Sequence, residues 1–200
     1  MPIAGSSFST RLQANMAAKG FLGSHVVDFC DAIGNGTVSA VTGAPFATVD
    51  TGSVPGVGTG AGVGLTGMIA ATIATQIQSL AVAAGMAGSA VPDICDCIAN
   101  ALVDEMGVAT LTSTHTPVFA GTGVVTVGSV IVAGSALSSS ITAAGLAAGL
   151  AGSGWPSFAD AIGNGQATGF LTATGSVTIT GSPTGGPVVP GAGAGVGVIS

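Results

Sequence analysis

Charged side chains are scarce in this chain of 200 residues: two are basic and eight are acidic, together 5% of the sequence. An average soluble domain carries roughly 25%. A monomer of this length normally covers its water-facing surface with Lys, Glu, Arg and Asp. Here that surface must be covered by Ser, Thr, Asn and backbone amides, by lipid, or by further protein copies. Two basic residues and a net charge of −6 cannot neutralise a run of phosphates, so we expect no nucleic-acid partner.

Side chains that support catalysis are also few. The two histidines, His25 and His115, lie at unrelated positions with no motif around them. Lys19 is the single lysine, which excludes a phosphate-binding loop of the Gly-x-x-x-x-Gly-Lys-Ser/Thr type. We therefore expect that the protein is not an enzyme and binds no cofactor.

Long uninterrupted apolar runs are missing, although the mean hydropathy is +0.78. A membrane-spanning helix needs about 20 mostly apolar residues, and the best windows, Met68–Ala87 and Val124–Leu150, are broken by polar residues and Gly. Trp155 is the single Trp and Tyr is absent, so there is no aromatic belt. Residues 1–20 lack the apolar core of a signal peptide, and we expect none. A membrane-associated or pore-forming protein is kept as an alternative.

What the sequence does contain is a threefold internal repeat. Asp31, Asp96 and Asp160 recur at nearly equal intervals along the chain, and each lies in a similar segment. This marker of each repeat is FCDAIGNG at 29–36, ICDCIANA at 94–101 and FADAIGNG at 158–165. A fixed period of this kind indicates an architecture of packed units. We assign residues 1–66 to repeat 1, 67–130 to repeat 2 and 131–200 to repeat 3, packed as one unit.

Each repeat predicts two helices followed by a β-hairpin or arm. The first helix is Ala-rich, with apolar residues at helical spacing, and covers residues 7–20, 68–85 and 135–149. The marker lies on the second helix. The Gly/Thr/Val-rich segments 46–65, 109–131 and 170–199 alternate like strands. We therefore predict an α+β fold of three tandem repeats of about 65 residues, which can pack around a pseudo-threefold axis.

An apolar stripe on the second helix supplies the predicted assembly and packing residues. About 65 residues bury little surface alone, so three units must pack together, or many must pack in an assembly. The Gly-rich segments are either flexible linkers or ordered arms on a neighbouring subunit, and their mutual similarity favours arms. The stripe consists of Phe29 and Ile33 in repeat 1, Ile94 and Ile98 in repeat 2, and Trp155, Phe158 and Ile162 in repeat 3.

Asp31, Asp96 and Asp160 are the charged positions that all three repeats keep. One interpretation is a solvated helix face, or an Asp that bonds the backbone of the adjoining loop. The other uses symmetry: three carboxylates around an axis form a ring that binds Ca²⁺. Apart from this ring we expect no metal site. The marker amides are predicted to end the helix or to bond the hairpin's backbone; they are Asn35, Asn100 and Asn164.

The three cysteines give a second set of candidates. Cys30 and Cys95 are repeat-equivalent and Ala159 replaces them in repeat 3, while Cys97 stands where the other repeats have Ala. Exchange of Cys for Ala on a helix indicates buried packing. A disulfide, within the chain or between copies, is the alternative. Cys95 and Cys97 would point about 200° apart on a helix, which disfavours a shared zinc ion.

Low charge, an abundance of Gly, Ala, Thr and Val, and a tripled marker with Gly-rich arms together resemble minor structural proteins of tailed-phage particles. The likeness is one of style over the whole chain. It implies a non-enzymatic virion subunit, made in the host cytoplasm, whose partners are copies of itself and other structural proteins of the particle. Self-association would bury apolar area at roughly 25 cal/mol per Å². An extracellular filament or sheath subunit is the remaining alternative.

Overall fold

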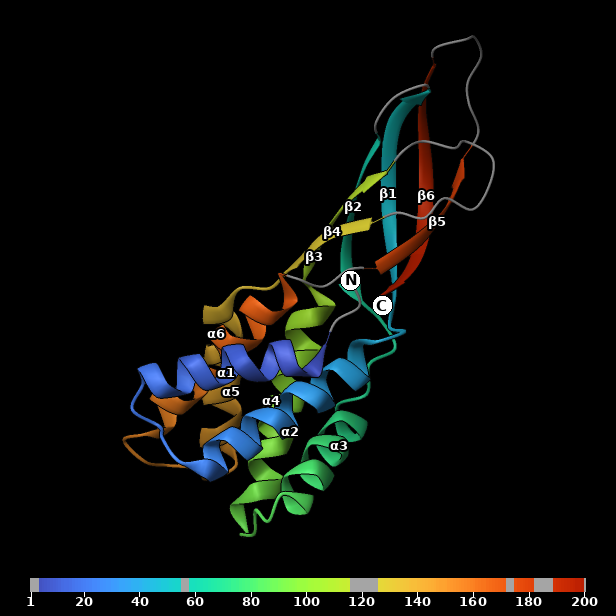
Figure 1. Cartoon of the computed structure of the whole chain (residues 1–200). Helices are drawn as coiled ribbons and strands as arrows, with labels where there is room; N and C mark the ends of the chain where they lie inside the picture. The colour runs from blue at the N-terminus through green and yellow to red at the C-terminus, as the bar shows by residue number, and fades with distance from the viewer. Residues whose placement is uncertain (1–3, 55–57, 116–125, 172–174, 182–188, 200) are drawn as a thin grey trace.

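The computed structural model describes residues 4–54, 58–115, 126–171, 175–181 and 189–199. In these residues six helices form a body, and six strands extend from it as one sheet (Figure 1). Two helices are followed by two strands three times along the chain. The elements are α1 (Gly5–Ala18), α2 (Ser24–Val41), β1 (Pro45–Val54), β2 (Gly58–Leu65), α3 (Ala70–Ala83), α4 (Ala90–Gly107), β3 (Thr110–His115), β4 (Thr126–Ile131), α5 (Gly134–Ala147), α6 (Trp155–Phe170), β5 (Gly175–Gly181) and β6 (Val189–Ile199).

The predicted helix pair of each repeat is confirmed. The first helices α1, α3 and α5 each have 14 residues and start at equivalent places in the repeats. Each is followed closely by a glycine with positive φ: Gly20 at 85°, Gly85 at 86° and Gly149 at 81°. Because only glycine adopts this conformation without steric cost, these three positions end the first helix and turn the chain towards the second.

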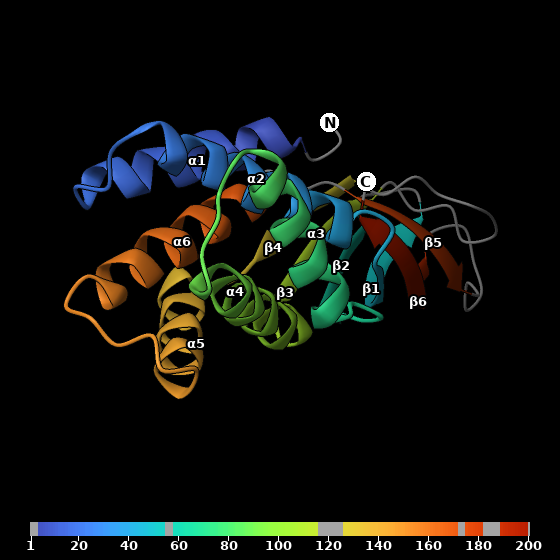
Figure 2. The ribbon, with the colours of Figure 1, turned by 90° about the horizontal axis from the view of Figure 1, so that it is seen from below.

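The six helices pack as a closed ring. Each helix packs against the next along the chain, and α6 packs back against α1 (Figure 2). Glycines allow the close approach: a Cβ on Gly36 of α2 would lie 2.6 Å from Cγ1 of Ile77 on α3. A Cβ on Gly165 of α6 would lie 2.8 Å from Cδ2 of Leu12 on α1. Leu12 and Ile77 are repeat-equivalent, so the same contact joins repeat 1 to repeat 2 and repeat 3 to repeat 1.

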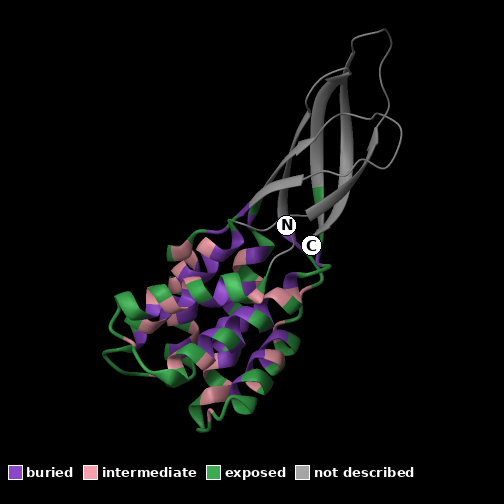
Figure 3. Ribbon diagram, in the orientation of Figure 1, coloured by how far each residue is buried: buried purple, intermediate pink, exposed green. Residues whose placement is uncertain are grey.

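The hydrophobic core lies inside this ring (Figure 3). Ile33, Ile98 and Ile162 of the marker helices are all fully buried. Two turns later on the same helices, Val41, Met106 and Phe170 are fully buried as well. The ring of Phe170 meets that of Phe8 on α1 edge to face, with the two centroids 4.8 Å apart, which joins the last repeat to the first.

The strands form a six-stranded antiparallel sheet with the order β4-β3-β2-β1-β6-β5. Within each repeat the two strands pair with one another, and the strand pairs of different repeats join through β2–β3 and β1–β6. The β1–β6 register runs without interruption from Pro45↔Val198 to Val54↔Val189. In their described residues the Gly-rich segments therefore form strands that pair within one chain rather than free linkers. Contact of these arms with a neighbouring subunit stays a prediction.

The marker asparagines do not end their helices. Asn35, Asn100 and Asn164 lie inside α2, α4 and α6, and each Nδ2 donates to the main-chain carbonyl of the Asp four residues earlier, at 2.9 Å in all three cases. The prediction that they end the helix or bond the hairpin is wrong. A side chain that bonds the preceding turn of its own helix can stay in the helix interior, which the short marker motif alone does not reveal.

Candidate functional site at the distal end of the helix ring

Short loops join the two helices of each repeat at the end of the helix ring that lies away from the sheet (Figure 1). Near these loops, aromatic side chains of repeats 1 and 3 contact one another. Phe158 on α6 is at their centre. Its ring stacks on that of Trp155 at a centroid distance of 5.5 Å and on that of Phe29 at 6.1 Å. It meets the ring of Phe21 edge to face at 5.8 Å. The cluster joins repeat 1 to repeat 3.

Trp155 is held in place by a polar contact at its edge. Its indole Nε1 donates to the main-chain carbonyl of Thr142 on α5, at 3.2 Å. A Cβ on Gly145, one turn further along α5, would overlap the indole ring. Because Gly145 has no side chain, the indole ring can lie directly against α5, and the hydrogen bond to Thr142 fixes its orientation. In this orientation the apolar face of the indole ring points towards Phe158.

These aromatic side chains line an open pocket of about 360 Å³, called here the distal pocket. No charged side chain lines it, so its wall offers mainly apolar contact. Large apolar side chains are also exposed at the same end of the body, and apolar surface of this kind can mark an interaction site. The distal pocket is lined by Phe21, Ile94, Leu150, Ala151, Gly152, Gly154, Trp155 and Phe158. The exposed side chains are Leu22 (76%), Leu146 (58%) and Val27 (43%).

The seven residues predicted for assembly and packing divide into two groups. Phe29, Ile33, Ile98 and Ile162 are buried inside the chain and are not available to another molecule. The other three line the distal pocket, with Ile94 and Phe158 half-buried; they are Ile94, Trp155 and Phe158. The sequence stripe did not separate these groups, because a helical stripe shows which side chains share a face but not which turn another helix covers.

Three contributors to the distal end were missed in the sequence. Phe21, Met86 and Leu150 are related by the repeat offsets and directly follow Gly20, Gly85 and Gly149. Each backbone N–H bonds the carbonyl of the residue five positions earlier, at 2.8–3.0 Å, which folds a large apolar side chain back over the helix end. The recurrence of a large apolar residue after each repeated glycine was the signal that could have identified them.

The three repeated aspartates are not brought together. Asp31 accepts hydrogen bonds from Ser9 Oγ and, at 3.4 Å, from Gln13 Nε2 on α1. In repeat 2 an alanine stands where repeat 1 has Ser9, and Asp96 is exposed. Among the residues that the structure describes, no group of three acidic, His or Cys side chains could hold a metal ion. The predicted Ca²⁺ ring of Asp31, Asp96 and Asp160 is therefore not formed.

Among the three repeated aspartates, Asp160 is the one whose carboxylate forms an ion pair with a basic side chain in the described residues. Lys19 Nζ lies 2.5 Å from its Oδ2, and Asn164 Nδ2 donates to Oδ1 at 2.8 Å. The hydrogen bond from Lys19 is the main reason that the pKa of the Asp160 carboxyl is lowered, against a smaller opposing effect of burial. This ion pair links the end of α1 to α6 beside the distal pocket.

The cysteines are free and buried, so the alternative of a disulfide among Cys30, Cys95 and Cys97 is not formed in the structure. Burial raises the pKa of the Cys30 thiol to about 12 and that of Cys95 to about 11, with Asp31 and Asp96 adding to the effect. Burial also raises the pKa of Cys97. Thiols in this state are protonated at neutral pH and are poor nucleophiles and metal ligands.

No family model, curated protein or solved structure matches the chain. None of the helices in the described ranges is long and apolar enough to cross a membrane. The distal end offers apolar surface and one ion pair, an arrangement suited to contact with another molecule.

Proposed function

We propose that this protein is a structural subunit of a large homomeric assembly, in a particle of the tailed-phage kind, and that it acts by self-association. One observation carries the proposal: a chain with 5% charged residues folds so that an apolar pocket opens at the distal end of its helical body, with exposed apolar side chains such as Leu22 at the same end. Burying such surface against another copy is favourable by roughly 25 cal/mol per Å². Few charged side chains have to lose their hydration when two copies associate.

A pseudo-threefold arrangement of the repeats supports this role. The helix ring closes through α6 and α1, and equivalent glycine contacts occur at two of the three repeat boundaries. Thr37 and Gln166 occupy repeat-equivalent positions on α2 and α6 and hydrogen-bond across the interior at 3.2 Å, with both side chains fully buried. A chain built in this way suits a position in a particle where rotational symmetries have to match.

The test measures size by light scattering coupled to gel filtration, over a concentration series and without detergent, followed by negative-stain imaging. We expect regular multimers of the wild-type chain and smaller species for Leu22→Asp, because Leu22 is 76% exposed at the distal end. Val108→Asp is the matched control, since Val108 is 67% exposed but follows α4 at the sheet end of the body.

The proposal is overturned if the wild-type chain is a monomer at every concentration, or if it stays dispersed only in detergent as small oligomers. The latter result would favour the membrane-associated alternative. Equal loss of size in Leu22→Asp and Val108→Asp would place self-association outside the distal end.

A further inference from the structure

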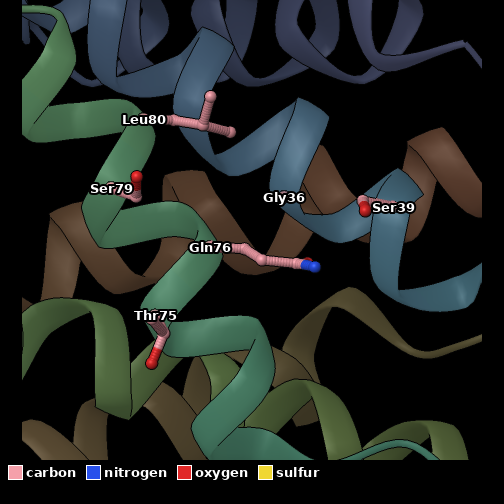
Figure 4. A pocket seen from close by; sticks show the side chains of 6 residues that line it. All are labelled: Gly36, Ser39, Thr75, Gln76, Ser79 and Leu80. Carbon is pink, nitrogen blue, oxygen red and sulfur yellow. The ribbon is translucent and has the colours of Figure 1, made fainter.

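A groove follows the boundary between repeat 1 and repeat 2, where α2 packs against α3 (Figure 4). It consists of a part of about 410 Å³ and an adjoining part of about 180 Å³ towards the sheet, and the two parts share Ser39 and Gln76. The groove is therefore elongated along the helices. Its total size lies in the range of pockets that bind ligands, about 300–1,000 Å³.

The side chain of Gln76 extends from α3 into this groove towards α2 (Figure 4). Its Oε1 atom is buried and accepts no hydrogen bond from any described residue. Buried side-chain oxygens without a donor are uncommon, because leaving one unpaired costs about 1–3 kcal/mol. The amide group lies at the groove with its nitrogen outermost, and a rotation about the last side-chain bond, which has a broad torsional preference, would turn the unpaired oxygen towards a hydrogen-bond donor there.

The equivalent boundary between repeat 2 and repeat 3 has a side-chain hydrogen bond at the position where Gln76 Oε1 has no partner among the described residues. Ser140 on α5 is the repeat-equivalent of Gln76, and its hydroxyl donates to Glu105 Oε1 on α4 at 2.8 Å. The residue of repeat 1 that corresponds to Glu105 is Ala40. One boundary is thus bridged by a side chain of the chain itself, whereas the other has an alanine opposite an unpaired amide.

The groove lining defines the chemistry of the occupant. Ser39, Thr75 and Ser79 contribute hydroxyl groups, and no charged side chain takes part. Apolar side chains come from Met68, Ile69, Ile73 and Leu80. Such a lining disfavours ions and suits a neutral molecule that combines hydrogen-bonding groups with apolar ones. An extended peptide has this property, and an elongated groove accommodates it better than a compact solute.

We propose that the groove between α2 and α3 binds an extended, uncharged peptide segment of another chain, one of whose backbone N–H groups donates to Gln76 Oε1. The site is separate from the distal pocket and does not depend on self-association there. It gives the protein a second contact, specific for a neutral backbone.

The first test titrates the ¹⁵N-labelled full chain with a blocked hexapeptide, acetyl-Gly-Thr-Gly-Ala-Gly-Val-amide, which copies residues 58–63. We expect saturable NMR shifts of the Gln76 side-chain amide and of the Ser39 and Ala40 backbone amides. The same hexapeptide built from N-methylated residues and ending in a dimethylamide lacks the N–H donors, and loss of one such hydrogen bond should weaken binding about three- to tenfold or more. Glucose is the neutral control that lacks a peptide backbone.

The second test introduces into the groove the side-chain hydrogen bond that joins α4 and α5 at the boundary between repeats 2 and 3. The double variant Ala40→Glu with Gln76→Ser recreates the Glu105–Ser140 pair and should abolish the hexapeptide shifts. Its thermal midpoint should equal or exceed that of the wild-type chain, which separates closure of the groove from misfolding. Leu80→Ala provides a milder variant that keeps Gln76 and should weaken binding.

Absence of saturable shifts in the wild-type chain overturns the proposal, as does equal binding of the N-methylated peptide or an unchanged affinity of the double variant. Binding of glucose in place of the peptide would assign the groove to a polyol instead. Each outcome is read on a dilute sample by NMR, so it stands apart from the light-scattering test of self-association.

Discussion

The interior of the helix ring and its distal end are built from the same three repeats, but they keep the repeat pattern to different degrees. In the interior, Ile33, Ile98 and Ile162 are the same residue, equally buried. At the distal end, Phe21 and Trp155 come from repeats 1 and 3, and repeat 2 supplies Ile94. Equivalent positions thus maintain the packing of the chain with itself. Equivalence is not complete in the interior either, since Val41, Met106 and Phe170 differ at one fully buried position, but at the distal end the differing residues line open surface.

The boundary between α2 and α3 follows the same rule on a smaller scale. Its tight contact, Gly36 against Ile77, has a repeat-equivalent contact between α6 and α1. At its open groove, Ala40 and Gln76 stand where the next boundary has Glu105 and Ser140, which hydrogen-bond to one another. At this boundary, a difference between repeats that lies at the surface coincides with a candidate binding groove.

The largest effect is expected from truncation in the interior. Ile162→Ala removes a fully buried side chain and should lower the free energy of unfolding by about 2–5 kcal/mol. Urea denaturation followed by circular dichroism measures the change. Leu171→Ala is the control: Leu171 is 53% exposed just after α6 and should change stability by no more than about 0.5 kcal/mol. Similar losses in both variants would contradict the contrast between a packed interior and an open surface.

A smaller loss is expected where two helices touch. Gly165→Ala places a Cβ 2.8 Å from Cδ2 and 3.0 Å from Cα of Leu12, so α6 and α1 have to move apart. Overpacking of this kind costs about 1–3 kcal/mol, of which the better helix propensity of Ala offsets about 1 kcal/mol. Gly152→Ala, where nothing lies within 4 Å of the added Cβ, is the matched control and should leave the thermal midpoint unchanged. An unchanged midpoint in Gly165→Ala would show that the contact is loose.

The smallest effect concerns the ion pair beside the distal pocket. Lys19→Ala should lower stability at neutral pH by no more than about 1 kcal/mol, because the Lys19 and Asp160 side chains are 42% and 35% exposed. The pKa of Asp160 is lowered in the folded chain, so its contribution is present above the unfolded pKa and is lost as the pH falls through the folded pKa.

Wild type and Lys19→Ala should therefore converge in stability in acid, and high salt should reduce their difference at neutral pH. Lys19→Arg keeps the charge and serves as the control. A difference between wild type and Lys19→Ala that is independent of both pH and salt would assign the loss to packing of the lysine stem instead.

Much of the helical body could be predicted because its signals are local. Ala-rich stretches with apolar residues at helical spacing and a glycine after each are sufficient to place α1, α3 and α5 within a few residues. The interior role of Ile33 in its apolar stripe follows from the same periodicity. The Asn35 side chain was misread because its bond to the Asp31 carbonyl keeps it inside α2, and the motif looks the same whether a helix ends there or continues.

The candidate site could be predicted only in part. Trp155 and Phe158 stood out as large side chains on a helical stripe, but their contact with Phe21 requires α6 to pack back against α1. The groove at Gln76 was not foreseen for a related reason. Its unpaired oxygen becomes visible only once α2 is seen to place an alanine opposite it.

The sequence by itself determined the number of repeats, the helix pair in each, and the scarcity of charge that points to contact with other molecules. These properties depend on composition and on spacings of a few residues, which the chain expresses wherever it folds. Only the tertiary structure decided that the ring closes, that the strands pair in the order β4-β3-β2-β1-β6-β5, and that Phe158 and Gln76 face open space. These outcomes depend on which segments far apart in the sequence come into contact. Repeat-equivalent residues look alike in the sequence even where the fold buries one of them and exposes another.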